Sequence, residues 1–291
     1  VLQALGDAEQ QDVAVAGVTY GIPPGLAAAS ARLGTGLAPI VAISPRPQHI
    51  PLSFAQQRMW FLNRFDPGLP TYNIPAVLRI TGRLDVAALR TAVVDVVRRH
   101  EVLRTTFPAV DGEPYQLIDS PESVDKHLDW AITGSPTDIE HAVTTGFDVT
   151  TQWPLRVRVL HTPSDSGPDE YVLALVAHHI AADGESRIPL VRDIVTAYAA
   201  RSVGRTPEFT PLEVQFADYA IWQRENFGSA DDPESLLGRQ LAYWTQQLAG
   251  LPDVIELPAD RPRPVVAGHH GGRVDLVVPG SVVGAVDILA A

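Results

Sequence analysis

The stretch YVLALVAHHIAADGESR, from Tyr171 to Arg187, decides the fold and carries the most suggestive chemistry of the chain. Residues 171–177 are apolar throughout, and a short run of this kind is typical of a central strand covered on both faces. The run ends in two adjacent histidines, His178 and His179, followed by a short loop through Asp183 and Gly184. A helix is then expected from near Glu185, because apolar residues recur at helical spacing: Ile188, Val191, Ile194, Val195 and Tyr198.

Periodicity and turn residues predict further elements on both sides of this stretch. Helices are expected at 54–65, 85–100, 138–147, 213–226 and 234–249, with a short one at 26–33 and another starting at the chain's end. Strands are expected at 72–81, 102–107, 115–118, 155–161 and 272–279, and Asp111-Gly112 is a hairpin signal. Because strands and helices are mixed rather than strictly alternating, the sequence predicts an α+β fold.

The composition excludes several classes of protein. With 291 residues, 45% hydrophobic and 19% charged, the chain suits one large or two modest globular domains. The net charge of −12 argues against a nucleic-acid partner, since phosphate backbones are met by clustered Lys and Arg. The absence of cysteine excludes disulfides, thiolate zinc sites and a cysteine nucleophile. No secretory signal or membrane-spanning stretch is visible, so we expect a cytoplasmic protein with no membrane partner.

The two histidines are expected to play different parts. Successive side chains of a strand point to opposite faces, so one histidine should face a reaction channel while the other packs beneath it. This geometry disfavours a two-histidine metal site, and no further ligand cluster accompanies the pair. The two adjacent histidines by themselves fit an alternative equally, in which both are hydrogen-bonded core residues at the end of a strand.

Asp183 also has two interpretations. It either orients His179, as in a Ser-His-Asp triad, or pairs with a buried arginine and holds the loop, with Gly184 allowing close backbone approach. The chain contains no G-x-S-x-G sequence, so a serine hydrolase is poorly supported. His179 would then act on a nucleophile that the substrate brings.

The segment HHIAADG resembles the HHxxxDG motif of the condensation domains of nonribosomal peptide synthetases, in the superfamily that includes chloramphenicol acetyltransferase. Four other stretches resemble motifs of the same family in the same order: PLSFAQQRMWFL at 51–62, RRHEVLRTTF at 98–107, VQFADYAIWQ at 214–223 and YWTQQLAGLPDVIELPADRPRP at 243–264. The resemblance covers residues 47–291 and implies two acetyltransferase-like, two-layer sandwich lobes that form a V-shaped pseudo-dimer around a channel. Residues 1–46 would be an upstream linker or module remnant, 47–208 the N-terminal lobe, and 209–291 the crossover and truncated start of the C-terminal lobe.

The resemblance implies amide formation in secondary-metabolite biosynthesis. The amine of an aminoacyl acceptor would attack the thioester carbonyl of an aminoacyl or peptidyl donor. Both substrates would arrive on phosphopantetheine arms, and no cofactor would be bound directly to the chain. The implied partners are donor and acceptor peptidyl carrier protein domains and a neighbouring adenylation domain.

The resemblance also assigns roles within the motif. His179 matches the catalytic histidine, which either accepts a proton as the tetrahedral intermediate forms or orients the amine. His178 would pack beneath it. Asp183 matches a structural aspartate whose expected partner is Arg104 of the LRT triplet, in a buried ion pair. Gly184 would bring a backbone N–H near the donor carbonyl.

Two further residues, Arg99 and Trp222, match recurrent positions of the family. Arg99 is explained about as well by a role as a surface charge, and Trp222 by a role in packing, as either is by a function. The motif departs from the family at Glu185, where tryptophan is frequent. The later motifs of the family are absent, so the isolated chain is expected to supply only one wall of the channel.

The remaining alternatives differ in activity. One is a free-standing acyltransferase that joins an acyl thioester to an alcohol or amine, and another is a truncated, non-catalytic domain that docks carrier proteins. An epimerisation domain shares the HHxxxDG signature, but the sequences around Pro51 and Val214 favour condensation.

Overall fold

A computed structural model describes residues 37–163, 168–255, 258, 261–262 and 276–290. The helix expected at 26–33 and most of the strand expected at 272–279 therefore lie outside the described residues. The chain divides into two compact units, residues 1–249 and 250–291, which are described separately. None of the described helices is long and apolar enough to cross a membrane.

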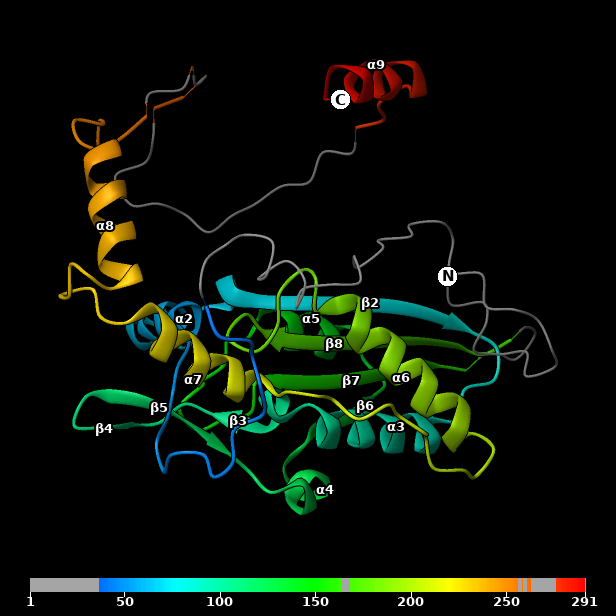
Figure 1. The fold of residues 1–291 in the computed structure, drawn as a ribbon. Coiled ribbons are helices and arrows are strands. Elements are labelled where there is room, and N and C mark those ends of the chain that lie inside the picture. Colours follow the sequence, from blue (N-terminus) through cyan, green and yellow to red (C-terminus); the bar gives the residue numbers. More distant parts are fainter. Residues whose placement is uncertain (1–36, 164–167, 256–257, 259–260, 263–275, 291) are drawn as a thin grey trace. The chain divides into compact units, whose positions relative to one another are not determined.

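A four-stranded sheet forms the centre of the first unit (Figure 1). Its strand order is β2 (Asn73–Thr81), β8 (Glu170–His178), β7 (Leu155–Thr162) and β6 (Asp129–Thr133). The pairings are antiparallel except that of β6 with β7, which is parallel. The prediction of an internal, buried strand at 171–177 is confirmed, since β8 lies between β2 and β7 and its last six residues are all buried.

Helices cover both faces of this sheet. Leu173 and Leu175 of β8 pack in the main hydrophobic cluster with α3 (Val86–Arg99) and α6 (Arg187–Arg201). Ala174 packs on the opposite face against α5 (Pro136–Thr144), and Val176 packs there with residues of α2 (Phe54–Phe65). This alternation along β8 separates two differently packed faces, and it determines the surroundings of each histidine at the strand's end.

A second sheet is built from short strands. β5 (Glu113–Ile118) pairs with β1 (Ile50–Pro51), β3 (Thr105–Thr106) and β4 (Ala109–Val110), all antiparallel. Asp111 and Gly112 join β4 to β5 with φ angles of 52° and 87°. Positive φ at both central residues is the requirement of a type I′ turn, so the predicted hairpin turn is confirmed. The strand predicted at 102–107 is wrong in its first part, because residues 101–104 form a 3₁₀ turn, and the strand that leads into the hairpin is β4.

The remaining described elements are α4 (Val124–His127), α7 (Phe216–Phe227) and α8 (Leu236–Gln247) in the first unit, with three short 3₁₀ turns, and α9 (Gly280–Ala290) in the second. The helices predicted at 54–65, 85–100, 138–147, 213–226 and 234–249 are confirmed with small shifts at their ends. The helix expected near Glu185 begins at Arg187. The prediction of a strand through Pro279 is wrong in its described part, because residues 276–279 have no strand pairing.

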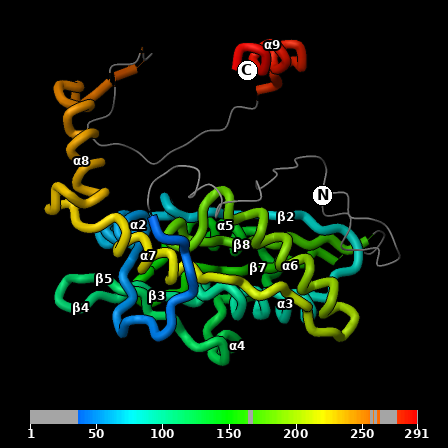
Figure 2. Tube along the Cα trace, viewed as in Figure 1, coloured from blue at the N-terminus to red at the C-terminus, as the bar shows by residue number. Residues whose placement is uncertain are grey.

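The segment before β1 runs beside α7, as Figure 2 shows in blue and yellow. Arg46 donates two hydrogen bonds to the carboxylate of Asp218, of 2.9 and 3.1 Å, and a third of 2.6 Å to Glu101. Asp218 is 1% exposed and also accepts the backbone N–H of Ile43. Residues 37–46 are thus joined to the first unit by a partly buried ion pair. The predicted lobe boundaries remain predictions.

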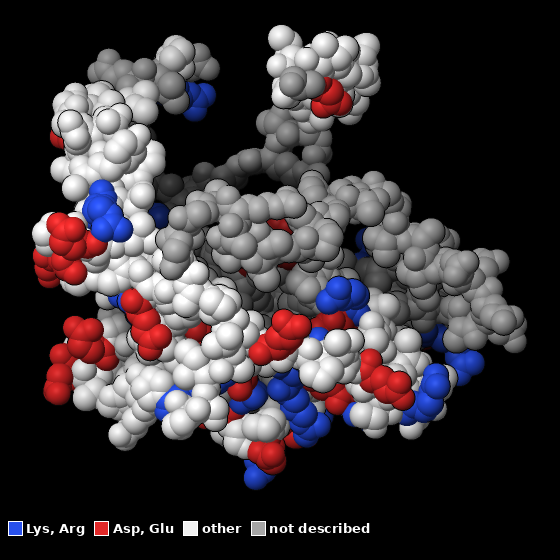
Figure 3. All heavy atoms as spheres, viewed as in Figure 1, with Lys and Arg blue, Asp and Glu red and all other residues white. Residues whose placement is uncertain are grey.

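Acidic and basic side chains are interspersed over the described part of the face shown in Figure 3. Several opposite charges pair across elements, such as Arg201 with Asp95 at 2.7 Å and Arg98 with Asp125 at 2.7 Å. This part of the surface therefore presents alternating charges rather than a field of one sign.

Candidate functional site

The backbone ladder of the main sheet continues one residue past β8. The N–H of His178 donates to the carbonyl of Pro154 at 3.0 Å, and the N–H of His179 donates to the carbonyl of Tyr72 at 2.8 Å. Since His178 pairs with Asn73 in the register of β2, His179 takes the next position opposite Tyr72. The two imidazoles are therefore presented to opposite faces of the sheet.

His178 is a buried, neutral side chain. It is 1% exposed, and its Nδ1 accepts the N–H of Ile180 at 3.1 Å. Its ring lies 6.1 Å from that of Phe147, centroid to centroid. Burial, assisted by the neighbouring His179, lowers the pKa of His178 from 6.5 to about 4. At neutral pH the ring is uncharged, and the accepting role of Nδ1 assigns its hydrogen to Nε2.

His179, in contrast, is exposed. The prediction that one histidine packs is confirmed for His178, whereas the prediction that His179 faces a reaction channel stays a prediction. An exposed imidazole on a backbone held by the sheet can accept or donate a proton without a large movement of the chain.

Gln56 joins the histidine loop to α2. Its side chain is 2% exposed, and its Oε1 accepts the N–H of Ser53 at 3.1 Å in a capping box at the start of α2. Its Nε2 donates to the carbonyl of Ile180 at 3.4 Å. Ser53 and Gln56 have the spacing of a capping box, whereas nothing in the sequence marks the second contact of Gln56 with the loop.

Asp183 is not paired with Arg104, and the predicted ion pair is wrong. The Asp183 carboxylate accepts the N–H of Ser186 at 2.8 Å and its hydroxyl at 2.5 Å, and these bonds hold the pKa of Asp183 below its ordinary value. Arg104 is 6% exposed, donates to the carbonyl of Asp119, and lies 3.9 Å from Glu101. A partner three residues away satisfies the aspartate locally, so the loop closes on itself before α6 begins.

Gly184 borders open space. A Cβ added at this position would meet no atom within 4 Å, and its φ is not in the left-handed region. Neither crowding nor backbone strain within the described chain explains a glycine here. The predicted approach of its N–H to a substrate carbonyl remains a prediction.

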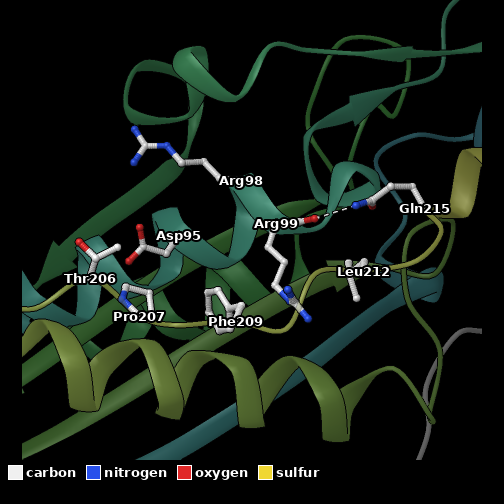
Figure 4. A pocket seen from close by; sticks show the side chains of 8 residues that line it. All are labelled: Asp95, Arg98, Arg99, Thr206, Pro207, Phe209, Leu212 and Gln215. Atoms are coloured by element: carbon white, nitrogen blue, oxygen red, sulfur yellow. Dashed lines mark hydrogen bonds between the residues drawn. The ribbon is translucent and has the colours of Figure 1, made fainter. Parts of the chain in front are cut away.

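Arg99 lies in a different part of the molecule from the histidine loop. Its Nε contacts Asp193 at 3.0 Å, its Nη1 donates to the carbonyl of Thr210 at 2.7 Å, and its guanidinium lies 4.7 Å from the ring of Phe209. It lines an open pocket of about 370 Å³ (Figure 4) together with Asp95, Arg98, Thr206, Pro207, Phe209, Leu212 and Gln215. No residue of HHIAADG is among them, so Arg99 connects α3, α6 and the segment before α7 rather than joining His179.

Trp222 also makes structural contacts. Its indole N–H donates to the carbonyl of Ala38 at 2.6 Å, and its ring stacks on Tyr219 at 5.9 Å. These contacts fasten the segment before β1 to α7. Among the described residues, no group of three or more His, Asp or Glu side chains could hold a metal ion.

A family model for the condensation domain matches residues 46–291. The chain is 47% identical over 250 residues to the isonitrile lipopeptide synthase of Mycobacterium tuberculosis (strain ATCC 25618 / H37Rv), which covers 84% of this chain and 10% of that protein. It is 44% identical over 250 residues to the dimodular nonribosomal peptide synthase of Bacillus subtilis (strain 168). That alignment covers 85% of this chain and 10% of the relative. The chain thus spans about a tenth of the length of these curated relatives.

Solved structures share the fold. The X-domain in complex with OxyB from teicoplanin biosynthesis superposes with a TM-score of 0.68 at 36% identity, covering 79% of this chain and 50% of that one. The first condensation domain of the CDA synthetase gives a TM-score of 0.54 at 21% identity, over 72% of this chain and 52% of that one, and shows the fold alone. The predicted acetyltransferase-like α+β lobe is confirmed by these likenesses. The chain belongs to the condensation-domain family of nonribosomal peptide synthetases.

Proposed function

We propose that this chain provides the histidine-bearing wall of a site that forms amide bonds between two thioester substrates in nonribosomal peptide synthesis. The observation that carries the proposal is the division of the histidine pair. His178 is 1% exposed and neutral, whereas His179 is exposed at the end of the same strand. The family membership and the synthetase relatives support the reaction class.

The reaction needs little base strength. An α-amine has an ordinary pKa of about 7.7–8.0, so an appreciable fraction is already the free nucleophile at neutral pH. The amine attacks the donor carbonyl, forming a C–N bond, and collapse of the tetrahedral intermediate breaks the C–S bond. His179 accepts the proton that the amine nitrogen loses and returns it to the departing thiolate, so the histidine ends each cycle unchanged.

The groups around His179 act by holding it in place. His178 is fixed through its Nδ1 by the N–H of Ile180, and the backbone of His179 is fixed by the carbonyl of Tyr72. Asp183 closes the following loop through Ser186 and contributes no reacting group. A pre-positioned imidazole avoids the entropic cost of orienting it in each turnover.

The proposed substrates are an aminoacyl or peptidyl donor and an aminoacyl acceptor, each on the phosphopantetheine arm of a carrier protein domain. A neighbouring adenylation domain would load the acceptor carrier. The chain itself binds no cofactor under this proposal, because the thioester already activates the carbonyl.

The likeness to the X-domain favours a second candidate function. That domain is solved in complex with OxyB, so a chain of this fold can serve as a docking surface for another protein. Under this candidate, the exposed His179 would be dispensable and the chain would recruit a partner without reacting.

The two candidates are separated by an assay of the natural full-length polypeptide with two loaded carrier proteins. The amide proposal predicts a dipeptidyl thioester on the acceptor carrier, detected by intact-protein mass spectrometry, and its loss in His179→Ala. His127→Ala is the matched control, because His127 is also exposed, at 57% of its side chain, and lies outside the motif. Product that persists in His179→Ala would overturn the proposed role.

A further inference from the structure

An apolar crevice lies under the first turns of α6, on the sheet face to which His179 is presented. Its floor is formed by β2, β8 and β7, and its wall by the loop after His179 and by Leu190 and Val191 of α6. All but one of its lining residues are apolar, the exception being Arg187 at the start of α6. The volume of this cavity, measured for the centre of a water molecule, is about 20 Å³.

The strand register places this crevice next to His179. Ile74 of β2, Ala177 of β8 and Leu155 of β7 lie side by side across the sheet, and all three line the floor. His179 follows Ala177 by two residues and takes the next position on the same face, because the backbone N–H of His179 continues the ladder by donating to the carbonyl of Tyr72. A step of two residues along a strand is about 6.6 Å, so the floor begins one same-face position from the imidazole.

The chemistry of the lining selects an aliphatic group. A dry apolar surface gains free energy from burying methyl and methylene groups and disfavours charged or hydrogen-bonding ones. The cavity is only slightly larger than the about 10–15 Å³ that one water-sized sphere needs, so it fits a group of about methyl size. Ala177 and Ala182 keep this space open, since any larger side chain there would enter it.

We propose that this crevice is a side-chain subsite that binds a small aliphatic group of one of the two thioester substrates. The proposal rests on the proposed function and adds a substrate class to it. The aliphatic group is either the side chain on the donor acyl unit or the side chain of the acceptor, and the reaction assay distinguishes these two sources.

The test uses a filling variant, an enlarging variant and a control. Ala182→Leu fills the crevice from the half-buried loop, and Val191→Ala enlarges it from α6. Ala199→Leu makes the same change as the filling variant at an exposed position of α6 outside the crevice. One arm varies the donor from glycyl to alanyl to valyl thioester with a fixed acceptor, and the other varies the acceptor in the same way.

We expect one arm to respond. In that arm Ala182→Leu lowers the ratio of kcat/KM for alanyl over glycyl substrates by about tenfold or more, as for a lost methylene site, while Ala199→Leu leaves it within about twofold. Val191→Ala should shift preference in the same arm toward a valyl substrate. Unchanged ratios in both arms for both crevice variants, with glycyl substrates still converted, would overturn the subsite.

Failure of the proposed function would be seen separately, as no product from the wild-type polypeptide with any pair. The subsite is then tested by binding alone, with S-propionyl-pantetheine measured by isothermal titration calorimetry. Binding that Ala182→Leu weakens about tenfold, and Ala199→Leu does not, supports the subsite. Equal binding by all variants, or none by the wild type, overturns it.

Discussion

Acidification should destabilise the first unit through His178, and the size of the effect follows from its burial. The pKa of His178 is lowered from 6.5 to about 4 in the folded chain, so below about pH 6.5 the unfolded chain binds more protons than the folded one. Stability therefore falls as the pH falls through this range, and the loss ends below about pH 4, where both states are protonated. Between about pH 7 and pH 5 the contribution of this single group is about 2 kcal/mol, at 1.36 kcal/mol for each pKa unit.

A variant that cannot titrate isolates this contribution. His178→Asn removes the imidazole, while the Asn carbonyl oxygen can accept the N–H of Ile180 as Nδ1 does. All five tryptophans lie in the first unit, so urea unfolding followed by tryptophan fluorescence reports on that unit. Between about pH 7 and pH 5, the free energy of unfolding should fall in both proteins. The fall in the wild type should exceed the fall in His178→Asn by about 2 kcal/mol.

The matched control is His49→Asn, which makes the same substitution at an exposed histidine that forms no ion pair within the described part of the chain. Carboxylates also titrate in this range, but their contribution is common to all three proteins and cancels in the difference. If His178→Asn showed the same pH dependence as the wild type, the account of a buried, neutral His178 would be refuted.

Three further predictions concern the supports of the fold. Asp218→Ala should lower the free energy of unfolding by about 1–3 kcal/mol, because it removes the buried acceptor of the Arg46 guanidinium and of the Ile43 N–H, and urea denaturation measures this. A double-mutant cycle between Asp183→Ala and Arg104→Met should give a coupling energy below about 0.5 kcal/mol, whereas a coupling of several kcal/mol would restore the ion pair that the structure lacks. Gly146→Ala places a Cβ 2.2 Å from a backbone oxygen, so its unfolding free energy should drop by about 1–3 kcal/mol, and an unchanged thermal midpoint would contradict the tight packing there.

The central strand and the fate of the two histidines could be predicted from the sequence. Both depend on local regularities: the apolar run of β8, and the alternation of side chains along a strand. The Asp111-Gly112 turn was predictable for the same reason, since its backbone conformation is a property of those two residues.

The contacts between distant segments could not be predicted in this way. Gln56 reaches the carbonyl of Ile180, 124 residues away, and nothing in the sequence of either segment marks that contact. β6 was missed because it is a five-residue edge strand, half polar, stabilised by parallel pairing with β7. Asp183 was assigned to a remote arginine by resemblance, whereas the nearer Ser186 satisfies it. Local hydrogen bonding by aspartate at helix starts competes with long-range pairing.

The most direct test of the account is the single-turnover rate of amide formation in His179→Ala and His178→Asn, measured in the natural full-length polypeptide with both carriers loaded. His179→Ala should lower this rate by about 100-fold or more, the usual contribution of a positioned acid–base group, without changing the unfolding free energy. His178→Asn should keep a larger share of the rate while losing the wild-type pH dependence of stability. A rate that survives His179→Ala within about threefold, in a well-folded protein, would contradict the claim that the exposed histidine reacts.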